Sequence, residues 1–135
     1  MQAKEFMQQV RKAESELKLI AMKRRHYEDL AASIGVKLTG MPSGSGGGSR
    51  VETAAVGLTI LTSQLTEKEK EYAALVRKAE KLIDKIPQEK FRKVLTLRYL
   101  CGISWRSIQD EMAYNDEKSV YRCNGYALKE LQKLM

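Results

Sequence analysis

The residues best suited to chemistry gather near the C-terminus, between residues 103 and 133. An arginine can bond both acceptors of a guanine edge, and lysine, serine and tyrosine can bond a phosphate or a base. Gly125 interrupts this run. Glycine in a helix interior costs about 1 kcal/mol relative to alanine, so we expect a backbone to come close there, either of DNA or of a neighbouring helix. The candidate DNA-binding residues are Arg106, Glu117, Lys118, Ser119, Tyr121, Arg122 and Gly125.

Catalytic and metal-binding patterns are not indicated. The chain has a single histidine, His26, and no acid, nucleophile or metal motif accompanies it. A structural zinc site usually takes four Cys or His ligands, and the chain has two cysteines and one histidine. Glycines 44–48 lack the Lys-Ser/Thr ending of a phosphate-binding loop. We therefore expect a protein that is not an enzyme and needs no cofactor or metal, with Cys101 and Cys123 as small apolar residues in a reduced compartment.

The elements that must position the candidates are three C-terminal helices of an all-α chain. Pro87 suits the first turn of a helix that continues to Cys101, and Gly102 is a good C-terminal stop. Ser104 is a natural N-cap for a short helix over residues 105–112.

The last helix begins after Asn115 or Asp116, either of which can cap it. Together with the short helix before it, the last helix matches the helix-turn-helix layout, in which the second helix lies in the major groove of DNA. The candidates of the last helix then lie outward near its N-terminal end. Its inward stripe is Val120, Cys123, Ala127, Leu131 and Leu134.

The first 85 residues form two long amphipathic patterns around a Gly/Ser-rich loop at 40–50. We expect an antiparallel, coiled-coil-like hairpin (domain 1–85) followed by the helix-turn-helix domain (86–135). A two-helix hairpin leaves part of each stripe uncovered, so we expect a homodimer; a monomer whose hairpin folds back on the C-terminal domain is the alternative. The expected stripes are Phe6, Val10, Ala13, Leu17, Ile20, Tyr27, Leu30 and Ile34, and Val51, Ala55, Leu58, Leu65, Tyr72, Leu75, Ala79, Leu82 and Ile86.

The chain carries a formal net charge of +7, which permits an anionic partner, but the excess is spread over both ends. The longest apolar runs are much shorter than the ~18–20 residues of a membrane span, and the N-terminus does not resemble a signal peptide. We expect a cytoplasmic protein.

The C-terminal motifs resemble region 4 of sigma-70-type factors and, more closely, small phage sigma-like late-gene activators of the RinA/ArpU sort. The resemblance implies a helix-turn-helix that binds promoter double-stranded DNA, and it raises host RNA polymerase as a second partner. The chain departs from the family pattern in two places. Ala113 stands where the pattern usually has Gly, so we expect Asn115 to supply the left-handed conformation of the turn. The turn from Ala113 to Val120 is also one residue longer than in the pattern. The matching motifs are Leu97-Arg98-Tyr99, Gly102-Ile103-Ser104-Trp105, Val120-Tyr121-Arg122 and Ala127-Leu128-Lys129-Glu130-Leu131.

Three functions follow as hypotheses. The first is a phage or mobile-element transcription regulator, an activator of late genes that binds promoter DNA as a dimer. The second is a small terminase-like subunit that recognises viral DNA for packaging. The third is a protein-interaction adaptor that does not read DNA.

Overall fold

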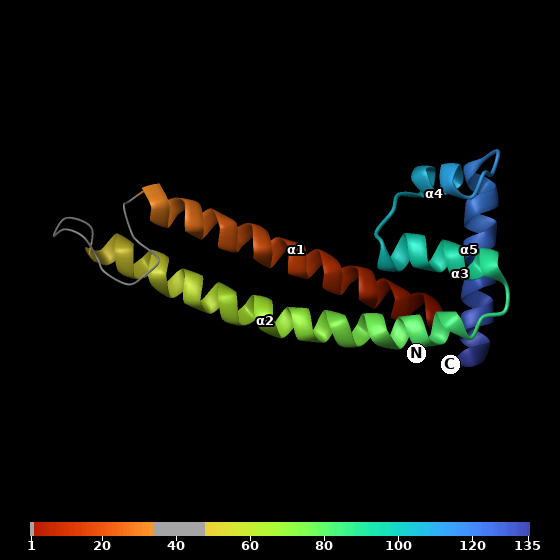
Figure 1. Ribbon diagram of the computed structural model, residues 1–135, viewed down its shortest axis with the longest axis horizontal. Helices are drawn as coiled ribbons and strands as arrows, with labels where there is room; N and C mark the ends of the chain where they lie inside the picture. The colour runs from red at the N-terminus through yellow and green to blue at the C-terminus, as the bar shows by residue number, and fades with distance from the viewer. Residues whose placement is uncertain (1, 34–47) are drawn as a thin grey trace. The chain divides into compact units, whose positions relative to one another are not determined.

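The computed structural model describes residues 2–33 and 48–135, and the regular secondary structure of these residues is all helical, with no strand. The expected all-α class is confirmed. None of the described helices has an apolar stretch that could cross a lipid bilayer. The elements are α1 (Ala3–Ser33), α2 (Gly48–Asp84), α3 (Glu89–Leu95), the π-helical segment η1 (Thr96–Leu100), α4 (Trp105–Glu111) and α5 (Glu117–Leu134), as labelled in Figure 1.

The chain forms two compact units. The first, here called the core unit, contains the chain up to Glu14 together with Tyr72–Met135. The second, here called the two-helix unit, is Ser15–Glu71. These bounds differ from the expected domains 1–85 and 86–135, because the first turns of α1 and the last turns of α2 pack among the C-terminal helices. Residues 40–47 of the expected Gly/Ser loop, and Ile34, lie outside the described residues. Residues 48–50 belong to α2, so the expectation that the loop extends to residue 50 was wrong.

The core unit is built on one apolar cluster to which all six helical elements contribute. Ala3 at the start of α1 is tied to the end of α5, since its backbone N–H donates to Oε1 of Gln132 at 2.6 Å. Fully burying a large apolar side chain contributes about 1.5–3 kcal/mol, so this cluster is the main source of the unit's stability. Its buried members are Ala3, Phe6, Met7, Val10, Ala79, Ile83, Ile86, Phe91, Val94, Leu95, Tyr99, Ile108, Val120, Cys123, Ala127 and Leu131.

A π-helical turn separates α3 from α4. The backbone N–H of Cys101 donates to the carbonyl of Thr96 at 2.9 Å, an i to i+5 bond that widens the helix. At 100° per residue, a continued α-helix would direct Arg98 toward the core beneath Phe91 and Leu95. The extra residue in the turn places Tyr99 there instead, and Tyr99 is buried. Arg98 is thereby turned sideways toward α4.

The caps of α4 and α5 largely follow the sequence. The Ser104 side chain accepts the backbone N–H of Ser107 at 3.3 Å, and Gly102, with φ of 67°, ends the preceding helix as expected. The cap of α5 is Asp116, not Asn115. The left-handed residue of the α4–α5 turn is Ala113, with φ of 56°, so the expectation that Asn115 would supply this conformation was wrong.

The two-helix unit consists of antiparallel segments of α1 and α2. Lys68 of α2 contacts Glu16 of α1, and Arg24 of α1 donates to Thr62 Oγ1 of α2 at 3.0 Å. The residue numbers therefore increase along α1 where those of its partners in α2 decrease, as in an antiparallel pair. The expected stripes need three corrections: Leu30 and Ala55 are exposed, and so is Leu134 at the end of α5. The buried positions that the stripes missed in this unit are Ala31, Ala54 and Leu61.

The corrections at Leu30 and Ala55 share one cause. The helical repeat of 3.6 residues drifts relative to a fixed three-and-four spacing, so a stripe extended over many turns moves away from the contact side. Leu30 and Ala55 each lie one residue from a buried alanine. The side chain of Val51 lies outside the described part of the chain.

Candidate nucleic-acid interface

The outward side of α5 is a cationic surface of the core unit. At 100° per residue, positions 118, 122, 125 and 129 lie on one side of the helix, opposite the buried Val120, Cys123, Ala127 and Leu131. The residues on this side are exposed, and three of them carry a positive charge. We call this surface the α5 face and define it as Lys118, Arg122, Gly125 and Lys129.

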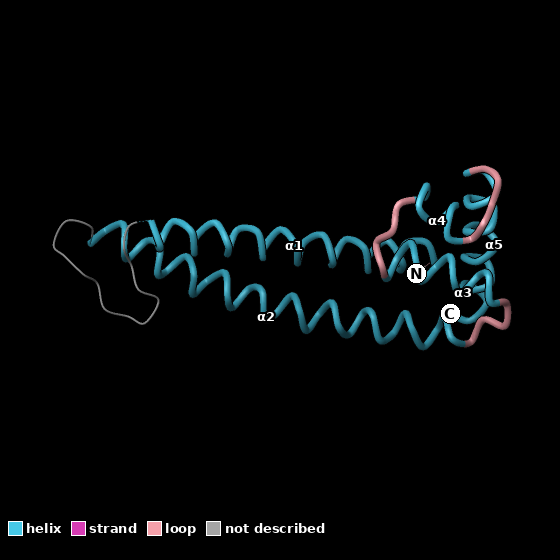
Figure 2. Tube along the Cα trace, turned by 45° about the horizontal axis from the view of Figure 1, so that its top comes forward, coloured by secondary structure: helices cyan, strands magenta, loops and turns pink. Residues whose placement is uncertain are grey.

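The helix that carries this face is held by α3 and α4, which both pack on it (Figure 2). Its first turn is fixed by Asp116, whose Oδ1 accepts the backbone N–H of Ser119 at 2.9 Å and its hydroxyl at 2.6 Å. These bonds from Ser119, with the charges of Arg122 and Lys118, lower the pKa of Asp116. Both polar groups of Ser119 therefore serve the cap, although Ser119 was a candidate for contact with DNA.

Tyr121 is placed by an aromatic stack that begins in η1. The guanidinium of Arg98 lies 4.2 Å from the centre of the Trp105 ring, and Trp105 meets the ring of Tyr121 edge to face at 5.2 Å. Burial lowers the pKa of Arg98, and the nearby charge of Arg11 lowers it further. The stack therefore links the π-helical turn to the exposed side of α5.

The remaining ends of this stack are also hydrogen-bonded. Arg98 Nη1 donates to the carbonyl of Ile103 at 3.2 Å. The Tyr121 hydroxyl donates to Glu117 Oε2 at 3.2 Å, and partial burial followed by this bond raises the pKa of Tyr121. Tyr121 remains 46% exposed, so its ring edge stays accessible while its hydroxyl and Glu117 are bound to each other.

Beside the α5 face lies a small cleft of about 180 Å³ between α3 and α5. Arg122 and Lys90 line it from the two helices, with Tyr126 and Tyr114. The hydrogen bond to Cys123, followed by burial, raises the pKa of Tyr114. The cleft therefore offers two cations and two phenol groups, a set that can bind an anionic group such as a phosphate.

Gly125 lies in the middle of the α5 face with open space above it. A Cβ built on Gly125 would meet no atom within 4 Å. The chain's own packing therefore does not require glycine at this position, and of the two expected explanations the close approach of a neighbouring helix is wrong for the described residues. A close approach by a bound molecule stays a prediction.

The structure brings most of the sequence candidates together on α5 but leaves one apart. Arg106 is exposed and lies on α4, outside the α5 face. Sequence reasoning missed Lys129, Tyr126 and Lys90. The first was visible in the sequence, because Lys129 follows Arg122 by seven residues, which is two helical turns; Lys90 could be found only from the packing of α3 on α5.

Comparisons of the chain with protein-family models, with curated proteins and with solved structures found no match. What the site can do therefore follows from its chemistry. The site offers exposed cations in a row along α5, the partly exposed ring of Tyr121, and an accessible stretch of backbone at Gly125. An extended polyanion fits this pattern of charge better than a small molecule, since the cleft is small and the cations continue beyond it.

Proposed function

We propose that this chain is a DNA-binding transcription regulator that lays α5 in the major groove of double-stranded DNA. The single observation that carries the proposal is the exposed α5 face, in which Gly125 lies between Arg122 and Lys129 and no atom of the described residues lies within 4 Å of a Cβ built on it. The order of α4, a short turn and α5 supports it, because a second helix that presents such a face is the part of a helix-turn-helix that enters the groove.

Within this proposal Arg122 forks onto a base edge, preferentially guanine, while Lys118 and Lys129 bind backbone phosphates. Tyr121 supports the same side of the helix through its ring. The resemblance of the C-terminal motifs to phage sigma-like activators makes late-gene promoters the expected targets and RNA polymerase the expected second partner. The protein acts as a homodimer in this proposal, and its work requires no catalysis.

The test is binding of the full chain to DNA selected from a random-sequence pool, measured by fluorescence anisotropy over a range of salt concentrations. Each phosphate contact contributes about 0.9 to the slope of log affinity against log salt. Replacing Lys118 and Lys129 by glutamine removes two phosphate contacts per copy and four per dimer, so it should lower the slope by about 3.6 and weaken binding to all sequences alike. Arg122→Ala should relax base preference at one position of each half-site and cost about 1–3 kcal/mol per half-site.

Lys70→Gln is the matched control, because Lys70 is an exposed lysine of α2, with 74% of its side chain accessible. It should leave the slope and the affinity unchanged. Absence of any DNA binding at low salt would refute the proposal and leave the adaptor hypothesis. Binding to DNA by a ring of many copies would favour the packaging subunit instead.

A further inference from the structure

The two-helix unit has a second uncovered surface that is apolar. Leu19 and Leu30 of α1 are 53% and 41% exposed, and Ile60 of α2 is 50% exposed. Leu19 and Leu30 are eleven residues apart, which returns to the same side of a helix after three turns and spans about 16 Å. Large apolar side chains in such a row are unusual on a surface that stays in water.

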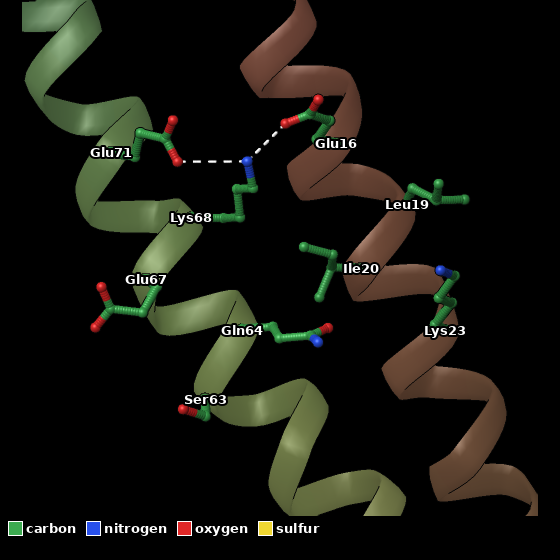
Figure 3. A pocket seen from close by; sticks show the side chains of 9 residues that line it. All are labelled: Glu16, Leu19, Ile20, Lys23, Ser63, Gln64, Glu67, Lys68 and Glu71. Atoms are coloured by element: carbon green, nitrogen blue, oxygen red, sulfur yellow. Dashed lines mark hydrogen bonds and ion pairs between the residues drawn. The ribbon is translucent and has the colours of Figure 1, made fainter.

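Of these three side chains, Leu19 lines a groove between the two helices. The groove has a volume of about 570 Å³, and Leu19, Ile20 and Gln64 are among the residues that line it (Figure 3). Lys68 lies between the helices at one end, where it bonds Glu16 at 2.7 Å and Glu71 at 3.3 Å. These two carboxylates raise the pKa of Lys68.

The register of the helices decides how the row could be covered. Facing residues of α1 and α2 have numbers that add up to 84 to 86, as for 16 with 68, 24 with 62 and 27 with 57. Ile60 therefore lies level with residues 24 to 26 of α1, which is about halfway between Leu19 and Leu30. The exposed apolar side chains are thus arranged symmetrically about the level of Ile60.

Helical phase places the row on one side of the pair. Arg24 and Tyr27, which contact α2, mark the inner side of α1, and Leu19 and Leu30 lie about 100° from it. Ile60 lies about 100° from the inner side of α2, turned toward the same face, as does Gln64 in the groove. Met22 is also exposed, at 68%, but it lies on the opposite side of α1 from α2.

Charge distinguishes between the two ways in which a second copy could cover the face. Three carboxylates, Glu16, Glu67 and Glu71, line the end of the groove that holds Lys68, whereas Lys23 lines its other end. If the α1 helices of the two copies ran in the same direction, the ends of the two grooves that hold these carboxylates would lie next to each other. If the α1 helices ran in opposite directions, the carboxylates of the two copies would be far apart, and Leu19 of each copy would face Leu30 of the other.

We propose that a second copy of this chain packs on this face with its helices reversed, about a two-fold axis that passes near Ile60. The interface is isologous, so one surface serves both copies. It buries the row of exposed apolar side chains in a four-helix arrangement. The proposed function includes a homodimer, and this proposal says which surface forms the dimer and in which direction the helices of the two copies run. The dimer forms without DNA, so it does not depend on DNA binding.

The first experiment measures the mass of the full chain by sedimentation equilibrium in the absence of DNA. The wild-type chain should be a dimer. Leu19→Glu and Ile60→Glu should each raise the dimer dissociation constant about a hundredfold or more, because each change removes two buried apolar side chains per dimer and introduces two charges. Met22→Glu is the matched control and should leave the dissociation constant unchanged. Helix content by circular dichroism should be the same in all four proteins.

The second experiment tests the direction by disulfide formation in a Cys101→Ser background, in which the remaining cysteine, Cys123, is buried. Chains with Ile60→Cys should form a disulfide-linked dimer, since the two residues lie next to the axis. Leu19→Cys chains should join Leu30→Cys chains when the two are mixed, whereas neither should join its own kind, because a disulfide needs Cα atoms within about 7 Å.

A wild-type monomer or a larger ring would overturn the proposal. So would a Met22→Glu chain that dissociates as readily as Leu19→Glu, or a dimer in which Leu19→Cys and Leu30→Cys fail to join. Because both experiments omit DNA, a chain that dimerises as described but binds no DNA would refute only the proposed function.

Discussion

Replacing Gly125 by alanine should change the stability of the fold and the affinity for DNA in opposite directions. The position lies inside α5, and a Cβ there meets no atom within 4 Å, so the substitution has no steric cost. Alanine is favoured over glycine in a helix interior by about 0.8–1 kcal/mol. For a domain of this size that gain corresponds to a rise in melting temperature of about 3–5 °C.

The same Cβ would stand on the outward side of the helix, between Arg122 and Lys129. If DNA approaches the backbone closely there, the methyl group should hold the helix away and weaken binding about tenfold or more, which is about 1.4 kcal/mol. Thermal unfolding followed by circular dichroism gives the first quantity, and anisotropy with labelled DNA gives the second. A control is Ala74→Gly, an exposed site in α2, which should lower the melting temperature and leave DNA affinity unchanged.

Two results would refute this reasoning. Failure of Gly125→Ala to raise the melting temperature would mean that the position is not open as described. A stabilised variant that binds DNA as tightly as the wild type would mean that no backbone of DNA comes close to α5 at this residue, and that glycine there has another origin.

Three further predictions concern the fold that holds α5. Ala113→Gly should raise the free energy of unfolding by about 0.5–1 kcal/mol in chemical denaturation, because Ala113 has φ of 56°, which strains a residue with a Cβ; an unchanged or lowered value would contradict the left-handed turn. Leu131→Ala should lower the free energy of unfolding by about 2–5 kcal/mol, since Leu131 is fully buried. Asp116→Ala should lower the melting temperature near neutral pH. Because the folded pKa of Asp116 lies below its ordinary value of 3.8, the cap's contribution is fully present above that value and is lost as pH falls through the folded pKa, so melting curves of the two proteins should converge in acid.

The local signals in the sequence predicted most of what holds α5. Ser104 and Gly102 do what their chemistry favours, and four of the five residues expected in the α5 stripe are buried. Such features depend on neighbours within one or two turns, which a single sequence displays directly. Leu134 was wrong because it lies at the last turn of α5, where little of the chain remains to cover it.

The features that sequence reasoning missed depend on packing between distant segments. Met7 belongs to the core with Leu131, so the unit that carries α5 includes the start of the chain, which no local pattern indicates. The π-helical turn at Thr96–Leu100 arises because Tyr99 fits the core and Arg98 does not, a competition that appears only when the surrounding helices are present. Lys90 joins Arg122 for the same reason.

The pairing of the first and last helices has a consequence for how the protein forms during synthesis. Ala3 binds Gln132, which is translated 129 residues later, so the core unit cannot close until α5 has left the ribosome. The two-helix unit is a continuous stretch, Ser15–Glu71, and it can fold while the rest is still being made. We expect the apolar side chains at the start of α1 to stay uncovered until α5 has emerged from the ribosome.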